Sequence, residues 1–366
     1  MGCTVGTAPA SLGITFQSVE AGRDYSCGLD THGTAYCWDG FPGTPVAVPG
    51  GVTFASLAVR AGHGCGLTEE GAAYCWGDNT YGQVGHPSGM SFSAPVAVDS
   101  GLTYRVIAVG LYHTCALTTA GALYCWGAND QGQVGLDSVP VPCDVGNGPT
   151  AFPCAPAPLP VRPDLRFVSL SAGDDHTCGI TTDSTAYCWG QGEAGELGDG
   201  AARRSTPTAV SGGFKFIAVS AGGRHSCGIT SSHDAYCWGS NTDLQLGSLS
   251  DDGGCAVSLL RCTTVPFAVV GGLKFDSITT SQAVPYAGTG PVLGGHSCGL
   301  TPEGLAYCWG LNEEGQLGAS QNLRSYTPVL SRGDTVFVQI SAGETHTCGL
   351  TPSGEIHCWD YLSPQP

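Results

Sequence analysis

The sequence predicts an all-β protein, a seven-bladed β-propeller whose blades are four-stranded antiparallel sheets and whose N-terminal strand closes the last blade. Three observations lead to this prediction. A phrase of Cys, nine residues, Cys and Trp occurs seven times, apolar alternations ending in Ala-Gly precede it, and Pro-led segments follow it. Each repeat therefore supplies four strands, and an array that spans most of the chain indicates one closed body.

The repeated phrase predicts the two central strands of each blade. When Cys298 is placed opposite Cys308, a three-residue loop remains, and its third residue is Gly304. Gly suits this place because a common three-residue hairpin loop ends with a left-handed residue. Ser184 and His233 hold the equivalent place in two repeats, so we expect those two turns to be strained or differently built.

Each of these cysteine pairs is predicted to form a disulfide across its hairpin, because opposed residues of antiparallel strands lie within the reach of a cystine. Two further pairs lie in inserted loops. In chain order the expected pairs are Cys27 with Cys37, Cys65 with Cys75, Cys115 with Cys125, Cys143 with Cys154, Cys178 with Cys188, Cys227 with Cys237, Cys255 with Cys262, Cys298 with Cys308, and Cys348 with Cys358. Cysteine use of this kind indicates an oxidising compartment, and without short zinc-knuckle spacings we expect no metal and no cofactor.

The flanking segments predict the innermost and outermost strands. "FVSLSAG" at 167 is typical of the first strand, and "PVAV" at 45 of the fourth. The seventh repeat lacks a Pro-led segment, whereas the chain begins with one, so we expect Pro9 to Leu12 to complete the seventh blade. The expected single domain, residues 1–366, comprises an N-terminal segment with the closing strand (1–15) and repeats at 16–50, 51–100, 101–163, 164–213, 214–272, 273–332 and 333–362.

Composition narrows the class of partner. The formal net charge is −17, which disfavours nucleic acid because phosphates would be repelled. Charged residues make up 12% of the chain, about half the usual ~25%, which is common in secreted proteins. No apolar run approaches the ~18 residues that span a bilayer, and we interpret the chain as a mature segment behind an added Met1.

Five repeats also carry a glycine-spaced loop between the third and fourth strands: "GDNTYGQVG" at 77, "GANDQGQVG" at 127, "GQGEAGELG" at 190, "GSNTDLQLG" at 239 and "GLNEEGQLG" at 310. Together with the Ala-Gly and His-x-Cys pattern before each hairpin, these loops resemble the regulator of chromosome condensation repeat. The resemblance implies a propeller that binds proteins through loops on its faces, without catalysis. The founder's nucleotide exchange and chromatin docking do not carry over, and the added disulfides favour a secreted bacterial member.

All long insertions fall in loops that join strands one to two or three to four, and these loops emerge on one face of a propeller. We call this the decorated face, and the opposite face, with its short turns, the plain face. The partner-binding candidates on the decorated face are Phe152, Leu259, Leu260 and Tyr286 as anchors, Asp251 and Asp252 for charge specificity, and the aromatic residues Tyr81 and Tyr112. In the alternative interpretation, the insertions have drifted and pack over blade edges.

A recurring histidine invites a metal-site hypothesis. It lies two residues before the first cysteine in six repeats, as His63, His113, His176, His225, His296 and His346, and Tyr25 replaces it in the first. A position repeated in every blade and replaced by Tyr is more typical of a structural side chain. We therefore expect these side chains to bond neighbouring backbone, with no metal.

These patterns favour a non-catalytic, monomeric binding scaffold, secreted, periplasmic or displayed on a bacterial surface, whose partner is a protein or surface macromolecule. One alternative is a secreted inhibitor of an enzyme. Another is a hydrolase or lyase at the propeller mouth, although no G-x-S-x-G, H-E-x-x-H or phosphate-binding motif occurs. Cys3 is left unpaired, and "MGC" resembles a processed lipoprotein start, so a lipid on Cys3 is the one expected membrane contact. A free thiol or an intermolecular bridge are the other possibilities.

Overall fold

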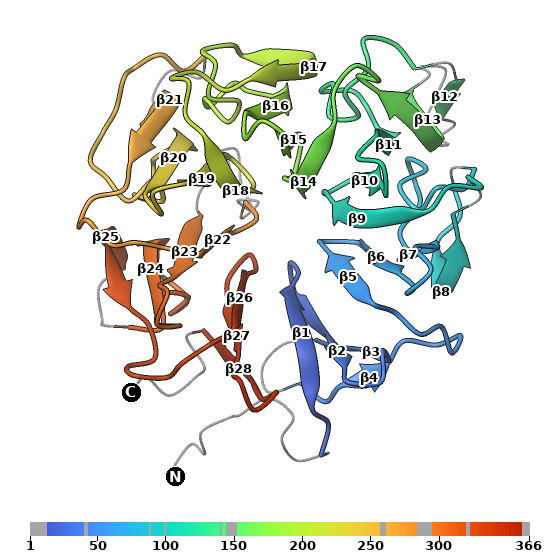
Figure 1. Ribbon diagram of the computed structural model, residues 1–366, viewed down its shortest axis with the longest axis horizontal. Coiled ribbons are helices and arrows are strands. Elements are labelled where there is room, and N and C mark those ends of the chain that lie inside the picture. Colours follow the sequence, from blue (N-terminus) through green and yellow to red (C-terminus); the bar gives the residue numbers. More distant parts are fainter. Residues whose placement is uncertain are drawn as a thin grey trace.

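Seven antiparallel β-sheets surround a central channel in the computed structural model (Figure 1). The structure describes residues 13–39, 43–87, 89–98, 100–139, 141–143, 152–256, 261–283, 295–319 and 323–360. Within these ranges every regular element is a strand. The predicted all-β, seven-bladed propeller of four-stranded blades is therefore confirmed.

The four strands of a blade run from the channel to the rim. The innermost strands are β1 (Phe16–Ala21), β5 (Ser56–Val59), β9 (Tyr104–Val109), β14 (Phe167–Ala172), β18 (Phe216–Ala221), β22 (Ser277–Thr280) and β26 (Gln339–Ala342). The second strands are β2 (Tyr25–Asp30), β6 (His63–Leu67), β10 (His113–Thr118), β15 (His176–Thr181), β19 (His225–Thr230), β23 (His296–Leu300) and β27 (Thr347–Leu350). The third are β3 (Ala35–Asp39), β7 (Ala73–Gly77), β11 (Leu123–Ala128), β16 (Ala186–Gln191), β20 (Ala235–Ser240), β24 (Ala306–Leu311) and β28 (Ile356–Trp359). The fourth strands, counted from the channel, are β4 (Val46–Ala47), β8 (Phe92–Ala97), β13 (Phe152–Val161), β17 (Arg203–Ala209), β21 (Cys262–Ala268) and β25 (Arg324–Leu330).

Two blades depart from the four-strand pattern. In blade 3 the inserted segment is partly a strand, because β12 (Val141–Cys143) pairs with an extended β13 and makes a five-stranded sheet. In blade 7 the described residues supply three strands, and the predicted closing segment, Pro9 to Leu12, lies outside the described residues. The ring nevertheless closes through described contacts, since Phe16 N donates to Gly354 O at 2.9 Å and Ala21 N donates to Ser341 Oγ at 2.9 Å.

The central hairpins have the predicted register. Cys115 lies directly opposite Cys125, and the same pairing recurs in the other six blades. At the third loop position Gly121 has a φ of 78°. Ser184 and His233 adopt the same left-handed conformation, with φ of 65° and 64°. These two turns are thus built like the others, at the steric cost that a side chain brings to positive φ.

Nine disulfides hold the molecule, seven of them across the central hairpins. In blade 3 the Cα atoms of Cys115 and Cys125 are 4.1 Å apart, and both residues are fully buried. The remaining two, Cys143–Cys154 and Cys255–Cys262, brace inserted segments. A chain bridged in this way is typical of an oxidising compartment.

The glycine-spaced loops fill the spaces between blades. The carbonyl oxygen of Gln83, in the loop of blade 2, accepts hydrogen bonds from Trp126 Nε1 and Thr114 Oγ1 of blade 3, both at 2.9 Å. Four further interfaces repeat this double acceptor, at Gln133, Glu196, Gln245 and Gln316. Because these donors are buried, each loop satisfies polar groups that would otherwise be costly.

The last glycine of each loop explains why the motif is so constant. Gly135 has a φ of 85°, and a Cβ at this position would lie 2.9 Å from Nε1 of Trp189 in the next blade. A larger residue would therefore be strained and would also collide with the indole. The preceding apolar residue, Val134, is fully buried. The five loops thus couple consecutive blades by the same packing.

Candidate functional site

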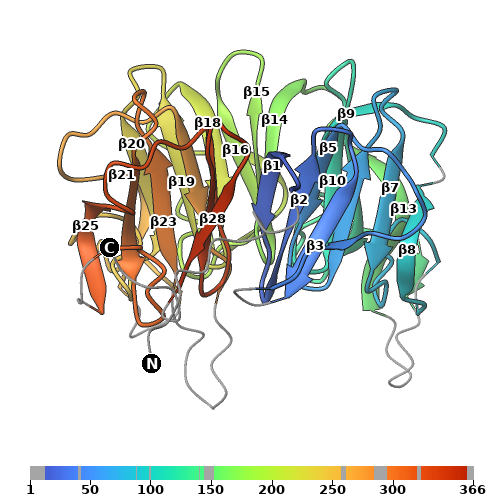
Figure 2. The ribbon, with the colours of Figure 1, turned by 90° about the horizontal axis from the view of Figure 1, so that it is seen from below.

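The loops joining strands one to two and three to four leave the same end of each blade, because all blades are antiparallel in chain order. Figure 2 shows the strands running between the two faces of the body. The inserted segments of blades 3, 5 and 6 all belong to these loops, whereas the hairpins of the plain face keep three residues. The long inserted segments therefore all belong to loops of the decorated face.

Tyr81 and Tyr112 form an aromatic pair on the decorated face. Their ring centroids are 5.0 Å apart in an edge-to-face arrangement, and 37% of the Tyr112 surface is exposed. Tyr81 belongs to the loop of blade 2 and Tyr112 to the first loop of blade 3. The sulfur of Cys143 lies 3.4 Å from the carbonyl oxygen of Tyr81, so the base of the blade 3 insertion packs beside this pair.

The blade 5 insertion rests on its neighbour in a similar way. Ala256 N donates to the carbonyl of Glu193 in the loop of blade 4 at 3.0 Å. Asp252, predicted to supply charge specificity, is exposed and accepts bonds from Thr264 N at 2.7 Å and Gly254 N at 3.0 Å. Burial opposes ionisation of this carboxylate, but these hydrogen bonds outweigh it and hold its pKa below the ordinary value. Asp251 likewise accepts from Gly253 N at 3.0 Å, so both carboxylates shape the loop itself.

Several predicted residues cannot be placed. Leu259, Leu260, Tyr286 and Cys3 lie outside the described residues, as does the side chain of Phe152, whose backbone begins β13. The structure therefore brings together Tyr81, Tyr112 and the base of the Cys143–Cys154 segment, and it places Asp251 and Asp252 in a separate loop of blade 5.

An ion pair bridges the channel at the decorated face. The Arg60 guanidinium, from blade 2, binds Asp174 Oδ1 of blade 4 through Nε at 3.0 Å and Nη2 at 2.9 Å. Its Nη1 donates to the carbonyl of Ala172 at 2.8 Å. Asp174 Oδ2 also accepts from Ala283 N of blade 6 at 3.1 Å. Three blades that are not neighbours are thus connected across the mouth.

Two carboxylates at this mouth have raised pKa values. Burial, reinforced by the negative charges of Asp174 and Asp130, raises the pKa of Asp175 to about 7. Burial also raises the pKa of Glu344 to about 7, although Arg23 lies 2.6 Å away and opposes the shift. Groups of this kind are suited to acid or base chemistry. However, the cavity that they line measures about 140 Å³, below the ~300 Å³ of ordinary ligand pockets.

The repeated histidines form bonds from blade to blade. Nε2 of His113 lies 2.8 Å from Thr177 Oγ1, and Thr177 in turn donates to the carbonyl of Gln133. Since the hydroxyl proton is used there, the histidine donates through Nε2. The same contact to a Ser or Thr hydroxyl of the next blade is made by His63, His176, His225, His296 and His346. The expected partner was backbone, and the observed one is a side-chain hydroxyl.

Burial keeps these imidazoles neutral. It lowers the pKa of His63, His113, His225 and His296 to about 3. Within the described part of the chain, no group of three His, Cys, Asp or Glu side chains is arranged to hold a metal ion. The histidines thus connect the blades as neutral donors.

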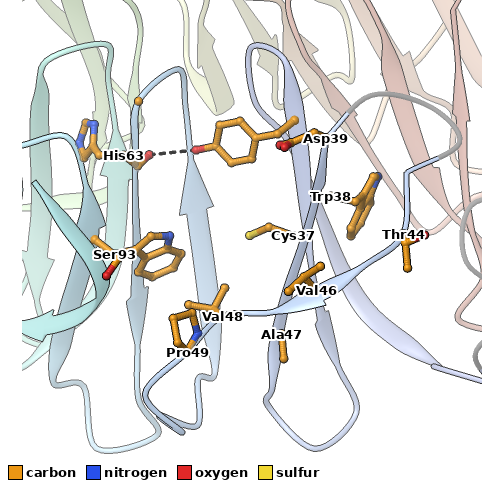
Figure 3. A pocket seen from close by; sticks show the side chains of 13 residues that line it. Cys37, Trp38, Asp39, Thr44, Val46, Ala47, Val48, Pro49, His63 and Ser93 are labelled. Atoms are coloured by element: carbon orange, nitrogen blue, oxygen red, sulfur yellow. Dashed lines mark hydrogen bonds between the residues drawn. The ribbon is translucent and has the colours of Figure 1, made fainter.

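The interface between blades 1 and 2 differs from the filled interfaces, and the sequence prediction missed it. A pocket of about 590 Å³ lies there, lined by residues of both blades that include Tyr25, Trp38, Val46 and Trp76. Figure 3 shows His63 and Asp39 at one end of this pocket and Ala47, Val48 and Pro49 at the other. Only six residues join β3 to β4, against fourteen between β7 and β8, and the glycine-spaced motif is missing from them.

Other residues at this interface have changed together with the loop. Gly64 stands where the other blades carry Ser or Thr, and a Cβ on Gly64 would lie 2.8 Å from Cζ2 of Trp76. Tyr25 replaces the histidine and donates from its hydroxyl to the carbonyl of Arg60 at 2.7 Å. Two features of the sequence indicated this pocket. The glycine-spaced loop occurs in five of the seven repeats and is missing from blade 1, and Gly64 stands where the other repeats have Ser or Thr.

Comparison with known proteins gives consistent matches. Two family models of the regulator of chromosome condensation (RCC1) repeat match, one at residues 61–83, 105–133, 167–196 and 216–245, and the other at 120–180, 183–229 and 303–350. Together they cover more than half of the chain. The ultraviolet-B receptor UVR8 of Arabidopsis thaliana is 28% identical over 204 residues, which are 54% of this chain and 42% of the receptor.

Two solved structures share the fold. Prp20p from Saccharomyces cerevisiae, described together with its binding properties to Gsp1p and histones, superposes with a TM-score of 0.71 at 19% identity, covering 94% of this chain and 81% of Prp20p. Human WBSCR16 superposes with a TM-score of 0.75 at 17% identity, covering 93% of this chain and 88% of that protein.

Proposed function

The chain belongs to the family of proteins built from the regulator of chromosome condensation (RCC1) repeat, and on that premise we propose that it is a non-catalytic binding scaffold that recognises a macromolecule through its decorated face. The partner class is a protein or surface macromolecule. Prp20p binds Gsp1p and histones, and UVR8 is a receptor, which supports binding as the general role. The net charge of −17 opposes a nucleic-acid partner.

The observation that carries the proposal is the unequal elaboration of the two faces. The decorated face holds both insertion disulfides, the blade 6 insertion and the Tyr81–Tyr112 pair. A braced loop loses less conformational entropy when a partner orders it, so such loops suit recognition. Exposed tyrosines also provide large contact area at little entropic cost.

The contacts of the insertions define which surface remains for a partner. Their bases pack on neighbouring loops, at Tyr81 and at Glu193, as the alternative interpretation of drifted insertions also requires. Asp251 and Asp252 bond their own loop but are exposed, so we keep them as candidates for charge specificity. We propose the exposed ring of Tyr112, together with Phe152, Leu259, Leu260 and Tyr286, as the contact residues.

The compartment follows from the disulfides. Nine bridges among the described residues support a secreted, periplasmic or surface-anchored protein, because a reducing cytosol would keep such thiols reduced. The described part of the chain contains no helix that could cross a membrane. A lipid on Cys3 is the proposed anchor, and mass spectrometry of protein isolated from its source checks it.

The test compares two surface variants with the wild-type protein. In the first, a short Gly-Ser turn replaces residues 248–261 and Cys262→Ser removes the unpaired thiol. In the second, Glu69→Lys and Glu70→Lys change an exposed plain-face hairpin. Each protein is used to capture partners from a surface fraction of the source organism, and captured proteins are quantified by mass spectrometry.

We expect the first variant to lose at least about 90% of the specific partner, and the second to retain it. A tenfold loss of affinity corresponds to about 1.4 kcal/mol. Loss of one strong contact costs at least this much, so we expect a loss of this size for a central loop. Unchanged capture by the first variant, or loss only in the second, would contradict recognition through the decorated face.

A further inference from the structure

We infer that the pocket between blades 1 and 2, here called the open groove, is a second binding site, which takes a peptide segment of a partner protein with the chemistry of the glycine-spaced loop. This site is separate from the decorated-face insertions, so it stands or falls independently of the proposed function. The occupant would place a main-chain carbonyl and a small aliphatic side chain beside Trp76.

Among the described residues, the indole N–H of Trp76 has no acceptor like that of the equivalent indoles. In five interfaces the equivalent indole donates from Nε1 to a loop carbonyl of the preceding blade, at distances of 2.8 to 3.0 Å. The described residues offer no such acceptor to Trp76, which is half-buried at the wall of the open groove. A donor at the wall of a groove favours a ligand that brings a carbonyl oxygen.

The second observation is an incomplete sheet edge. In blade 2 the outer strand pairs with the third strand at Gly77, opposite Phe92. In blade 1 the corresponding pairing ends at Cys37, opposite Val46. Asp39 pairs with Tyr25 of β2 on its inner side, but among the described residues it has no strand partner on its outer side. An exposed strand edge accepts an extended peptide by main-chain hydrogen bonds.

The shape and polarity of the open groove also fit a peptide. Its volume of about 590 Å³ falls within the ~300 to 1,000 Å³ of typical ligand sites. Val46, Val48 and Pro49 supply apolar walls, and 67% of the Val46 surface is exposed. Asp39 is the one acidic residue of the lining, and burial keeps His63 neutral. The groove therefore favours an uncharged segment, with a basic neighbour near Asp39.

The filled interfaces indicate which segment fits. In blade 3 the loop presents the Gln133 carbonyl, a fully buried Val134 and then Gly135 against Trp189. All five loops keep an aliphatic residue and a glycine in these last two places. In five interfaces the glycine-spaced loop thus occupies the position that is open between blades 1 and 2.

The experiment uses ¹⁵N-labelled wild-type protein and a synthetic peptide copying residues 127–135, GANDQGQVG. The indole ¹H–¹⁵N signal of Trp76, assigned with Trp76→Phe, is followed during titration to about 5 mM peptide, because a short unbraced segment loses affinity to ordering. A control peptide carries Glu in place of its Val. A second control protein has residues 40–45 replaced by residues 78–91, so that its own chain can fill the groove.

We expect a saturable shift of the Trp76 indole signal, with the indole signals of the five filled interfaces unchanged. The Glu-containing peptide should bind at least about tenfold more weakly, the Trp76→Phe protein about fivefold more weakly as judged from backbone amides, and the loop-grafted protein not at all. Absence of any shift, equal binding of both peptides, or undiminished binding to the grafted protein would each overturn the inference.

Discussion

The interface between blades 2 and 3 and the interface between blades 1 and 2 are built from the same repeat, yet one is closed and the other is open. In the first, Gln83 accepts bonds from Trp126 and Thr114. In the second, the loop is short, Gly64 removes the hydroxyl, and Trp76 lines a pocket of about 590 Å³. The difference shows that the loop of one blade completes the next blade, so loss of a single loop creates a groove without disturbing the sheet register.

The largest expected difference in stability is between removing a tryptophan side chain from the closed interface and removing one from the open interface. Trp126→Ala leaves a cavity in a fully buried site and strips a buried carbonyl of its donor, so we expect a loss of about 3 to 5 kcal/mol in the free energy of unfolding. Trp76→Ala enlarges a groove that is already open, and about 1 to 2 kcal/mol is expected. Denaturant unfolding of the oxidised proteins measures both. Equal losses would mean that the two interfaces are packed alike.

A pH-dependent contrast exists among the filled interfaces themselves. Glu196 stands where four other loops have Gln, and its Oε1 has no hydrogen-bond partner among the described residues. Burial raises its pKa to about 7. The folded state thus binds this proton more tightly than the unfolded state, and stability falls as pH rises from about 4.5 to 7.

Glu196→Gln should therefore change little at pH 4.5 and stabilise by up to about 3 kcal/mol at pH 8, since each unit of pKa shift corresponds to about 1.4 kcal/mol. Ala194 N, which donates to Glu196 Oε2 at 2.8 Å, keeps an acceptor in the amide oxygen. Thermal unfolding of both proteins across this pH range measures the effect. The same gain at both ends of the range would contradict the raised pKa.

The filled interfaces carry a Ser or Thr hydroxyl at the position equivalent to Gly64, and mutation can remove this hydroxyl. Thr177→Val keeps the volume but leaves the buried Nε2–H of His113 without an acceptor and the Gln133 carbonyl with one donor fewer. We expect a loss of about 1 to 3 kcal/mol. Thr177→Ser, which retains the hydroxyl, is the matched control and should lose under about 1 kcal/mol. If the two variants unfold at the same denaturant concentration, the histidine contact contributes nothing.

The smallest expected effect concerns the residue that replaces histidine beside the open groove. Tyr25→Phe removes the hydroxyl that donates to Arg60 O at 2.7 Å, and the lost bond should cost about 0.5 to 1.5 kcal/mol. Because this tyrosine also lines the groove, affinity for the loop peptide is a second readout. A gain in stability would show that the hydroxyl is not a useful donor there.

The fold could be predicted from the sequence because its signals are local and repeated. Cys115 with Cys125 fixes a hairpin register, and the Pro-led segments mark the outer strands. For the turns at Ser184 and His233 the sequence left two alternatives open, a strained turn or a different one, and the positive φ of both residues supports the first. The partner of the repeated histidine was also predicted wrongly as backbone, because the hydroxyl that it contacts belongs to the next blade, 64 residues away in the case of His113.

The candidate site was less predictable. The sequence did not show that the carboxylate of Asp252 also binds Thr264 and Gly254, a contact that depends on how the loop folds back. The open groove was missed because the glycine-spaced loop is missing from blade 1, whereas the indole that it would contact, Trp76, belongs to blade 2. Only the three-dimensional pairing of each loop with the next tryptophan reveals that the described residues of blade 1 leave a pocket beside Trp76.

Hydrogen exchange of the indole N–H groups tests the contrast between closed and open interfaces most directly. In the native protein transferred to D₂O, the indoles of Trp126, Trp189, Trp238, Trp309 and Trp359 should exchange slowly, because each is buried and bonded to a loop carbonyl. The Trp76 indole should exchange at least about a hundredfold faster, because the described residues give it no such acceptor and it lines the groove. Protection of Trp76 equal to that of the other five would contradict the account.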